Sequence, residues 1–278
     1  MHKQRILIAG CGDVGSALGV ELAAAGHFVQ GLRRTINQLP AGIHGIAADL
    51  TDPASLQKLP ACDILVYCTA ATTHDENGYR LAYVEGLRNL LAALPAPPRQ
   101  LFFTSSTGVY HQADGRWVDE SSTTEPTGFS GRILLEAERL ALGSGIPATV
   151  VRFSGIYGPG RNHLLNQVRS GIAAPAEPPH YGNRIHRDDC AGVLAHLIRR
   201  CLDERPLEPL YLATDDAPTP LHEVMEWLAL QLGVEICERK PVRRGGSKRC
   251  RNTRLKASGY RLRYPDYRTG YAQILADE

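Results

Sequence analysis

The amino-acid sequence predicts an α/β fold, in which a doubly wound parallel sheet carries a small C-terminal lobe. Through residues 1–155, short apolar segments alternate with longer segments of helical periodicity. The apolar segments are continuous, which is typical of strands covered by helices on both faces of a sheet. Such alternation favours right-handed crossovers between parallel strands. A glycine-rich turn directly after the first strand fits the same class.

The predicted elements follow one another in a regular order. The first strand is RILIAG, after which Val14, Leu18 and Leu22 share one face of a helix. The next predicted elements are the strands 27–34, 43–50 and 63–70, a helix over 78–94, the strand 100–106, a helix over 132–145 and the strand 148–158. Beyond these the pattern loosens, and the Pro- and Ala-rich segment 171–180 is loop-like. A helix over 187–202, a strand over 209–214 and a helix over 221–233 complete the series.

Length and composition limit the functional classes. With 278 residues, 43% of them hydrophobic, the chain can bury one large core, or one core with a small appendage. No apolar run approaches the roughly 18 residues of a membrane span. The first strand starts too early to leave room for a signal peptide, so we expect a cytoplasmic protein with no membrane partner. The seven cysteines lack any C-x-x-C pair, which argues against a disulfide framework or a metal site.

The net charge of +2 conceals a basic segment. Residues 239–256 hold nine Lys or Arg and no acid, which leaves 2 − 9 = −7 for the remainder. A basic run can bind nucleic acid or an anionic small molecule, or it can be a solvated loop. The run contains no aromatic residue and the chain no nucleic-acid motif, so we expect no nucleic-acid partner.

The turn after the first strand has the spacing G-x-G-x-x-G. Gly10, Gly12 and Gly15 lie between a strand and a helix, with Asp13 and Val14 inside the motif. The three glycines allow a tight turn, close approach of a pyrophosphate, and packing of helix on strand. The helix N-terminus then faces the phosphates. The motif therefore predicts a dinucleotide site, and an ordinary tight turn is the alternative.

The end of the second predicted strand indicates which dinucleotide binds. An acid that holds the ribose 2′-hydroxyl is expected there, but the sequence has Arg33 and Arg34. A guanidinium can pair with a 2′-phosphate, so the sequence favours NADP over NAD. Two solvated arginines are the alternative reading.

Two further strand ends supply candidate cofactor contacts. Asp49 and Leu50 could flank the adenine, although Asp49 could equally cap a turn with Thr51. The fourth predicted strand ends in Cys68, Thr69 and Ala70, which we also assign to the cofactor. From these positions we expect a Rossmann-type dinucleotide domain over residues 1–158, completed by about 181–215. Residues 159–180 and 216–278 would then form the small substrate lobe.

Several motifs, taken in order, resemble the extended short-chain dehydrogenase/reductase superfamily, specifically its NAD-dependent epimerase/dehydratase family in an atypical bacterial branch. They are the glycine loop, AADLTDP, VEGLRNLLAAL, SSTGVY, VVRFSGIYGPGRN, RIHRDD and YLATDDAP. The resemblance covers nearly the whole chain. It implies a Rossmann fold, a nicotinamide cofactor and a small-molecule substrate, most commonly a sugar nucleotide.

The resemblance assigns a catalytic role to one hydroxyl of LFFTSSTGVY. In the family a Ser or Thr at the end of this strand holds the substrate oxygen beside the nicotinamide, and the matching position is Ser106. Ser105 and Thr107 could instead satisfy backbone groups. Where the family's dehydratases carry an acid pair, this chain has Thr107 and Gly108, neither of which exchanges protons at neutral pH. Dehydratase chemistry is therefore disfavoured.

The Tyr-x-x-x-Lys pair that the resemblance leads one to expect is absent. Matched on Ala137 and Glu138, Ser130 occupies the Tyr position and Leu134 the Lys position, and no tyrosine in the chain is followed four residues later by lysine. Three explanations are open. The protein uses another proton donor, it binds a dinucleotide without turnover, or it catalyses a reaction that needs no proton relay. The candidate donors near strand ends are Tyr67, His74, Tyr79, Tyr83 and His111.

On the substrate side, the family-like segments contain Arg152, Asn162 and Arg184. Their donors suit a phosphate or carboxylate. A structural ion pair is the alternative for Arg152, and His186 with Asp189 is expected to fix a helix start. We therefore expect an NAD(P)-binding oxidoreductase or epimerase that acts on a small anionic carbonyl compound or sugar nucleotide. A non-catalytic dinucleotide-binding regulator or scaffold is the alternative.

Overall fold

The structure, a computed structural model, describes residues 3–241 and 246–277. Within these ranges the chain divides into two compact units. Unit 1 comprises Met1–Val109, Glu125–Arg152 and Cys190–Tyr211, and unit 2 comprises Tyr110–Thr124, Phe153–Asp189 and Leu212–Glu278.

Strands and helices alternate through the first half of the chain, as the sequence predicts. The strands are β1 (Arg5–Ala9), β2 (Phe28–Arg33), β3 (Ile43–Ala47), β4 (Ile64–Tyr67), β5 (Gln100–Ser106), β6 (Asp114–Val118), β7 (Ala148–Phe153), β8 (Gly155–Tyr157), β9 (Ile172–Ala173), β10 (Tyr181–Gly182), β11 (Arg184–His186), β12 (Leu210–Ala213), β13 (Thr219–Pro220), β14 (Glu238–Arg239) and β15 (Ser247–Cys250). The helices are α1 (Asp13–Ala24), α2 (Glu76–Tyr79), α3 (Gly86–Ala93), α4 (Phe129–Leu142), α5 (His163–Arg169), α6 (Arg187–Leu202), α7 (Leu221–Leu232), α8 (Thr253–Ala257) and α9 (Tyr267–Ala276).

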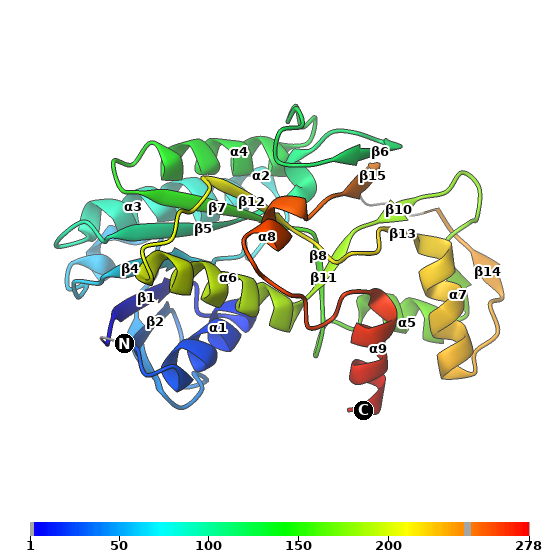
Figure 1. The fold of residues 1–278 in the computed structure, drawn as a ribbon, viewed down its shortest axis with the longest axis horizontal. Coiled ribbons are helices and arrows are strands. Elements are labelled where there is room, and N and C mark those ends of the chain that lie inside the picture. The colour runs from blue at the N-terminus through cyan, green and yellow to red at the C-terminus, as the bar shows by residue number, and fades with distance from the viewer. Residues whose placement is uncertain (1–2, 242–245, 278) are drawn as a thin grey trace. The chain divides into compact units, whose positions relative to one another are not determined.

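The central sheet has seven strands in the order β12-β7-β5-β4-β1-β2-β3. The register pairs Leu7 of β1 with Gln30 of β2 on one side and with Leu65 of β4 on the other, in parallel. Helices α2, α3 and α4 cover one face of the sheet, and α1 and α6 cover the other (Figure 1). The fold is thus the α/β, doubly wound parallel sheet that the sequence predicts. Its strand order reverses between β1 and β4, where such sheets bind ligands at the carboxyl ends of the strands.

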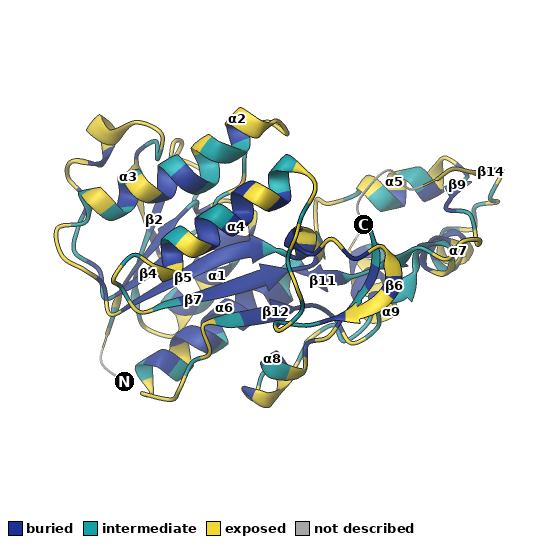
Figure 2. Cartoon of the chain, turned by 90° about the horizontal axis from the view of Figure 1, so that it is seen from above, coloured by how far each residue is buried: buried dark blue, intermediate teal, exposed yellow. Residues whose placement is uncertain are grey.

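The core of unit 1 consists of the strands' own side chains. Strands β1, β4 and β5 are buried almost along their whole length (Figure 2), because each contacts helices on both faces. Tyr67 and Phe103 stack there with ring centroids 5.7 Å apart, and both are fully buried. These strands therefore form a rigid base for the polar residues at their carboxyl ends.

The helix predicted over 78–94 is not uniform. Residues Arg80–Glu85 form a π-helical segment between α2 and α3. The Tyr67 hydroxyl donates a hydrogen bond of 2.5 Å to the Ala82 carbonyl, the group that an α-helix would offer to the N–H of Gly86. A side chain at Gly86 would also collide with this hydroxyl, since a Cβ atom there would lie 2.7 Å from it. The inserted tyrosine accounts for the irregular turn.

Unit 2 is held together by two-stranded pairs and three helices. β6 pairs with β15, β8 with β11, β9 with β14 and β10 with β13. Helices α5, α7 and α9 pack around a buried cluster that includes Leu228, Tyr267 and Tyr271. The pairing of β6 with β15 explains why residues 110–124 belong to this unit, although they follow β5 directly in sequence.

The start of α6 differs in one detail from the expected arrangement. The Nδ1 atom of His186 accepts a hydrogen bond of 3.2 Å from the N–H of Asp188, so His186 fixes the helix start as expected. Asp189 does not. Its buried carboxylate accepts hydrogen bonds from the Tyr260 hydroxyl (2.7 Å) and from the N–H groups of Arg263 (2.8 Å) and Tyr264 (2.9 Å). Asp189 thus fastens the segment before α9, because that distant segment folds back onto it.

All seven cysteines are free thiols, and five of them are buried. Within 3–241 and 246–277, none of the helices is long and apolar enough to cross a membrane.

Candidate functional site

The glycine loop has the geometry that a dinucleotide pyrophosphate requires. Gly10 adopts φ +85°, and a Cβ atom placed on it would lie 2.6 Å from the Cys68 carbonyl oxygen. A Cβ atom on Gly15 would lie 2.7 Å from the Gly10 carbonyl oxygen. Gly12 is different, since a Cβ atom there would meet none of the described atoms within 4 Å. Two glycines therefore allow close packing, and the third faces the open space that a phosphate needs.

Helix α1 presents its N-terminus at this open position. Gly12 is the N-cap residue and supplies no side chain to cap the helix, which begins with Asp13 and Val14. The first bond of the helix runs from the Ser16 N–H to the Gly12 carbonyl at 2.8 Å. The N–H groups of the first turn cannot bond within the helix and carry its positive dipole end. The loop and α1 together fit an anionic pyrophosphate.

The two arginines at the end of β2 lie beside the glycine loop. The Arg33 guanidinium donates to the Cys11 carbonyl at 3.4 Å and to the Gln38 side chain at 3.5 Å. Both contacts are long, and Arg33 is half-buried while Arg34 is exposed. The Arg33 guanidinium therefore lies against the glycine loop, next to the strand end at which the sequence motif leads one to expect an acid.

Asp49 and Leu50, after β3, have structural contacts. The Asp49 carboxylate accepts hydrogen bonds from the Thr51 N–H (2.9 Å) and hydroxyl (2.8 Å), and these bonds hold its pKa below the ordinary value. This is the turn cap that the sequence offered as an alternative. Leu50 packs at the edge of the unit 1 core, and its carbonyl accepts from the Asn89 side chain at 3.0 Å.

The end of β4 contacts the glycine loop. The Cys68 N–H donates to the Ala9 carbonyl at 2.8 Å, which continues the pairing with β1. Thr69 donates to the Ala82 carbonyl at 3.3 Å, and Ala70 is exposed. The structure thus brings the glycine loop, the arginines after β2 and the end of β4 to one edge of the sheet.

Ser106 ends β5 and is half-buried. Its hydroxyl oxygen accepts a hydrogen bond of 3.0 Å from the Gly108 N–H, in the short 3₁₀ turn Thr107–Val109. The oxygen keeps a lone pair and its proton for another partner. Gly131, next to Ser130, fits against this turn, because a Cβ atom on it would lie 2.8 Å from the Gly108 carbonyl oxygen. The start of α4 therefore lies against the turn that follows Ser106.

Ser105 has a different partner. Its hydroxyl donates to Glu138 of α4 at 2.5 Å, and Glu138 also accepts two hydrogen bonds from Arg152 of β7, at 2.9 Å and 2.6 Å. Glu138 and Arg152 are 4% and 5% exposed. A carboxylate and a guanidinium buried this deeply are paired to each other, so the geometry supports the structural alternative for Arg152. The signal in the sequence was an acid on the apolar face of α4, four residues after Leu134.

The structure leaves no phenol–ammonium pair on α4. Ser130 is half-buried in the first turn, and Leu134 is 5% exposed among apolar neighbours. Four aromatic side chains gather instead near the start of this helix, with ring centroids 5.3–5.5 Å apart. They are His74, Tyr79, Tyr83 and Phe129.

Two of the candidate proton donors, Tyr67 and Tyr83, are not activated phenols. Burial raises the pKa of Tyr83 to about 12, and it also raises the pKa of Tyr67, whose hydroxyl donates to the Ala82 carbonyl. A phenol with a raised pKa is a weaker acid than usual. His111 is an exposed residue of unit 2.

In unit 2 the two predicted substrate residues have unlike environments. Asn162 is the N-cap residue of α5 but makes no cap hydrogen bond with its side chain. Arg184 is 6% exposed, lies over the Tyr267 ring at 5.7 Å, and its Nη1 atom is buried without a hydrogen-bond partner in the described chain. Asp215 is 1% exposed, and burial, opposed by Arg184, raises its pKa to about 8. Sequence reasoning missed Asp215, whose approach to Arg184 depends on the fold of unit 2.

Comparison with known proteins agrees with this geometry. One relative is the UDP-N-acetyl-alpha-D-glucosaminuronate decarboxylase of Bacillus cytotoxicus, 28% identical over 180 residues. The match takes in 57% of this chain and 56% of that protein, so it spans little more than half the length of this relative.

Solved structures resemble the chain over its whole length. One, from Methylobacillus flagellatus and provisionally described as an NAD-dependent epimerase/dehydratase, is 43% identical with a TM-score of 0.84, over 99% of both chains. The human epimerase family protein SDR39U1 (isoform 2), solved with NADPH, shares the fold with a TM-score of 0.79 at 20% identity, over 99% of this chain and 100% of that one.

The family model for NAD dependent epimerases/dehydratases matches residues 6–218. This range runs from β1 to the loop after β12 and includes the glycine loop, Ser106 and Arg184. With the fold, the open position at Gly12 and the family model in agreement, the chain belongs to the NAD-dependent epimerase/dehydratase family.

Proposed function

We propose that this protein binds NADP at the glycine loop and acts as an oxidoreductase or epimerase on a small anionic carbonyl compound, such as a sugar nucleotide. One observation carries the proposal. Gly12 faces open space at the uncapped N-terminus of α1, while Arg33 and Arg34 stand where an acid would select NAD. The free thiols support the cytoplasmic location expected from the sequence.

The substrate class rests on two supports. The decarboxylase of Bacillus cytotoxicus is named for a sugar nucleotide, which makes this class the first to test. In unit 2, Arg184 has a buried Nη1 atom with no partner in the described chain, and a guanidinium of this kind suits a phosphate or carboxylate. The pairing of Arg152 with Glu138 favours the structural alternative for this residue, so the proposal for the substrate rests on Arg184.

Within this proposal, Ser106 would hold the substrate oxygen, and a nicotinamide cofactor held at the glycine loop would supply or accept hydride at the carbon that carries this oxygen. Ser106 can donate its proton to a carbonyl oxygen, since its own oxygen already accepts from Gly108. A serine hydroxyl is too weak an acid to replace a phenol as proton donor, so the rate of any reduction is low.

A second candidate function is binding without turnover, as a regulator or scaffold. It is favoured by the apolar burial of Leu134 at the Lys position and by the raised pKa of Tyr67 and Tyr83. Both functions share the dinucleotide site and differ only in the chemistry.

Analysis of the nucleotide released from the purified protein tests the shared part. A dinucleotide with a 2′-phosphate supports the proposal, and protein that neither carries nor binds NADP or NAD contradicts it. Two incubations, of the NADP⁺ complex with UDP-sugars and of the NADPH complex with carbonyl compounds, each followed by chromatography of the products, then separate the two functions. New products indicate an enzyme, and unchanged substrates in both incubations with the dinucleotide bound indicate the regulator.

A further inference from the structure

Among the described residues of the basic segment 239–256, two arginines form no ion pair with a described acid. Arg239 pairs with Glu226 at 2.6 Å and Lys240 with Glu238 at 2.9 Å. Arg254 approaches Glu120 at 3.9 Å and Lys256 pairs with Asp216 at 3.0 Å. Lys248 is buried against the Tyr110 carbonyl at 3.4 Å. Of the described cations in the segment, this leaves Arg249 and Arg251. Residues 242–245 lie outside the described ranges.

Arg249 and Arg251 are held by aromatic rings. Arg249 lies opposite Trp117 in the pairing of β15 with β6. Its guanidinium carbon is 5.0 Å from the Trp117 ring centroid and 4.9 Å from that of Tyr181, and its Nε donates to the Gly115 carbonyl at 2.7 Å. Arg251 lies over Trp117 at 4.9 Å. Stacking fixes the plane of a guanidinium and leaves the N–H groups on its edge free to donate.

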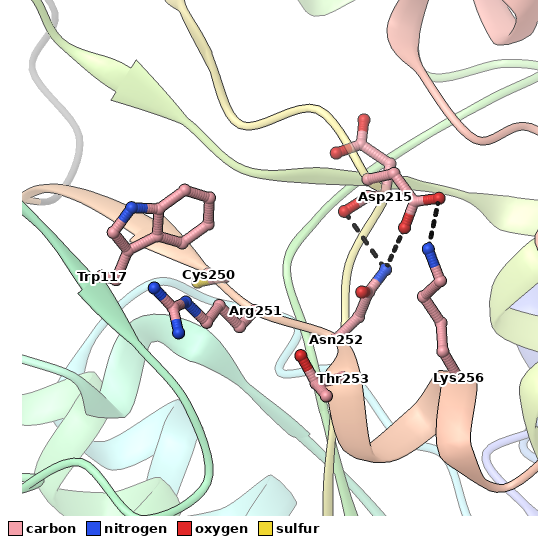
Figure 3. A pocket seen from close by; sticks show the side chains of 8 residues that line it. Trp117, Asp215, Cys250, Arg251, Asn252, Thr253 and Lys256 are labelled. Carbon is pink, nitrogen blue, oxygen red and sulfur yellow. Dashed lines mark hydrogen bonds and ion pairs between the residues drawn. The ribbon is translucent and has the colours of Figure 1, made fainter.

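A pocket of about 320 Å³ opens beside this stack (Figure 3). Trp117 and Arg251 line one side, and Asn252, Thr253 and Lys256 line the other, from the start of α8. All these residues belong to unit 2. The volume is at the lower end of the range for small-molecule sites, roughly 300–1,000 Å³, so it suits a small metabolite rather than a dinucleotide.

The carboxylates in the pocket wall are already occupied. Asp216 accepts from the Asn252 side chain at 2.7 Å and from Lys256 at 3.0 Å. The Asp215 carboxyl group accepts from the Ala217 N–H at 3.3 Å and points away from Asn252 and Lys256 in Figure 3. The charges of Lys256 and Asp216 cancel each other. Among the described lining residues, Arg251 therefore contributes a positive charge that no acid neutralises.

We propose that this pocket is a second ligand site, which binds the phosphate group of a small organic phosphate through Arg251, with the Thr253 hydroxyl and the Lys256 ammonium as further donors. Charge-assisted hydrogen bonds from a guanidinium to phosphate are among the strongest in proteins. The stacking on Trp117 holds the guanidinium in place before the ligand arrives, which lowers the entropic cost of binding. The pocket lies in unit 2, and the glycine loop lies in unit 1.

Trp117 reports on the site directly. The chain has two tryptophans, Trp117 and Trp227, so the variant Trp227→Phe leaves Trp117 as the sole indole. Titration of this variant with glycerol phosphate, at constant ionic strength set by sodium chloride, should give a saturable change in fluorescence. Adding Arg251→Ala should weaken binding about tenfold, the effect of losing one charge-assisted contact.

Lys240→Ala is the matched control, because it removes the same charge from the basic segment away from the pocket. It should leave the affinity unchanged. Equal weakening by both variants would mean unspecific attraction, and the absence of a saturable signal would mean that the pocket binds no phosphate; each overturns the proposal. Displacement of glycerol phosphate by a much tighter single-stranded oligonucleotide would make the partner a nucleic acid, which also overturns it. If Trp227→Phe fails to fold, calorimetric titration of the wild type and the Arg251 variant gives the same comparison.

Discussion

Arg152 and Glu138 form a buried, two-pronged ion pair that also holds the hydroxyl of Ser105. The pair joins α4 to strand β7. In the central sheet, β7 is the neighbour of β5, the strand that ends in Ser106. The pair therefore helps to hold in place the strand that carries the candidate catalytic residue.

Breaking this pair should destabilise the protein strongly. Glu138→Ala leaves a guanidinium and a serine hydroxyl buried without their partner, and the loss of a buried partner costs about 3–5 kcal/mol. Urea unfolding measures the change. Glu136→Ala, two residues away on the same helix, breaks the exposed pair with Arg80 and should have a much smaller effect. Equal effects of the two substitutions would show that the buried pair contributes no special stability.

Gly12→Val should abolish dinucleotide binding and leave the thermal stability nearly unchanged. The new side chain would enter the open space at the α1 N-terminus, where its Cβ atom meets none of the described atoms within 4 Å, but it would exclude the pyrophosphate. Gly10→Ala should instead lower stability, because Gly10 has φ +85° and its Cβ would collide with the Cys68 carbonyl. Calorimetric titration with NADPH and thermal melting of both variants check this contrast. Undiminished binding by Gly12→Val would make the loop an ordinary turn.

NADPH should bind at least about tenfold more tightly than NADH, a difference of about 1.4 kcal/mol. The reason is pairing of the 2′-phosphate with Arg33 and Arg34, which replaces repulsion by an acid. The double substitution of both arginines by Ala should erase most of the difference, while Lys58→Ala, an exposed cation elsewhere in unit 1, should preserve it. A preference of the wild type for NADH, or equal affinities, would contradict the assignment.

Reduction of generic carbonyl or sugar-nucleotide substrates should be slow or undetectable, because general acid–base assistance worth roughly 10²- to 10⁴-fold is missing. Any residual rate should fall in Ser106→Ala without loss of stability. In Ser105→Ala the melting temperature should fall instead, since that hydroxyl serves Glu138. Consumption of NADPH and thermal melting distinguish the two. Robust turnover that survives Ser106→Ala would place the chemistry elsewhere.

Grafting the pair as Ser130→Tyr with Leu134→Lys should raise the rate only if the buried site accepts an ammonium.

Asp215 should make the stability of the protein depend on pH. Its pKa is about 8 in the folded state, raised by burial from an ordinary value of 3.8. Below the ordinary pKa, Asp215 is protonated in both the folded and the unfolded state, and its titration costs no stability. Between about pH 4 and pH 8 the unfolded state releases the proton while the folded state keeps it, so stability falls by about 1.4 kcal/mol per pH unit. Above that window the loss is complete.

Asp215→Asn should remove this dependence. In urea unfolding, the stability of the variant relative to the wild type should therefore increase from pH 5 to pH 8. Asp63→Asn is the control. Arg5 lowers the pKa of Asp63, which is therefore ionised in both states throughout this window, and its substitution should shift stability by the same amount at each pH. Parallel curves for Asp215→Asn and the wild type would show that Asp215 titrates normally.

The sequence by itself determined the fold class, the glycine loop and the family. These depend on short-range patterns: continuous apolar strands, helical periodicity, and glycines at fixed spacing between a strand and a helix. It also revealed the absence of the Tyr and Lys on α4, because that pair lies within a single helix turn. Each of these features is encoded within a few neighbouring residues.

Only the tertiary structure decided which polar residues meet. Ser105, Glu138 and Arg152 come from three elements, and their pairing gives Arg152 the structural ion pair that the sequence offered only as an alternative. The structure also shows that the described cations of the basic segment fall into three groups: paired with an acid, buried, or stacked on an aromatic ring. This grouping depends on the pairing of β15 with β6, which brings Arg249 opposite Trp117. Such contacts join residues far apart in the chain, and their energies depend on burial and distance, which a pattern of neighbouring residues does not contain.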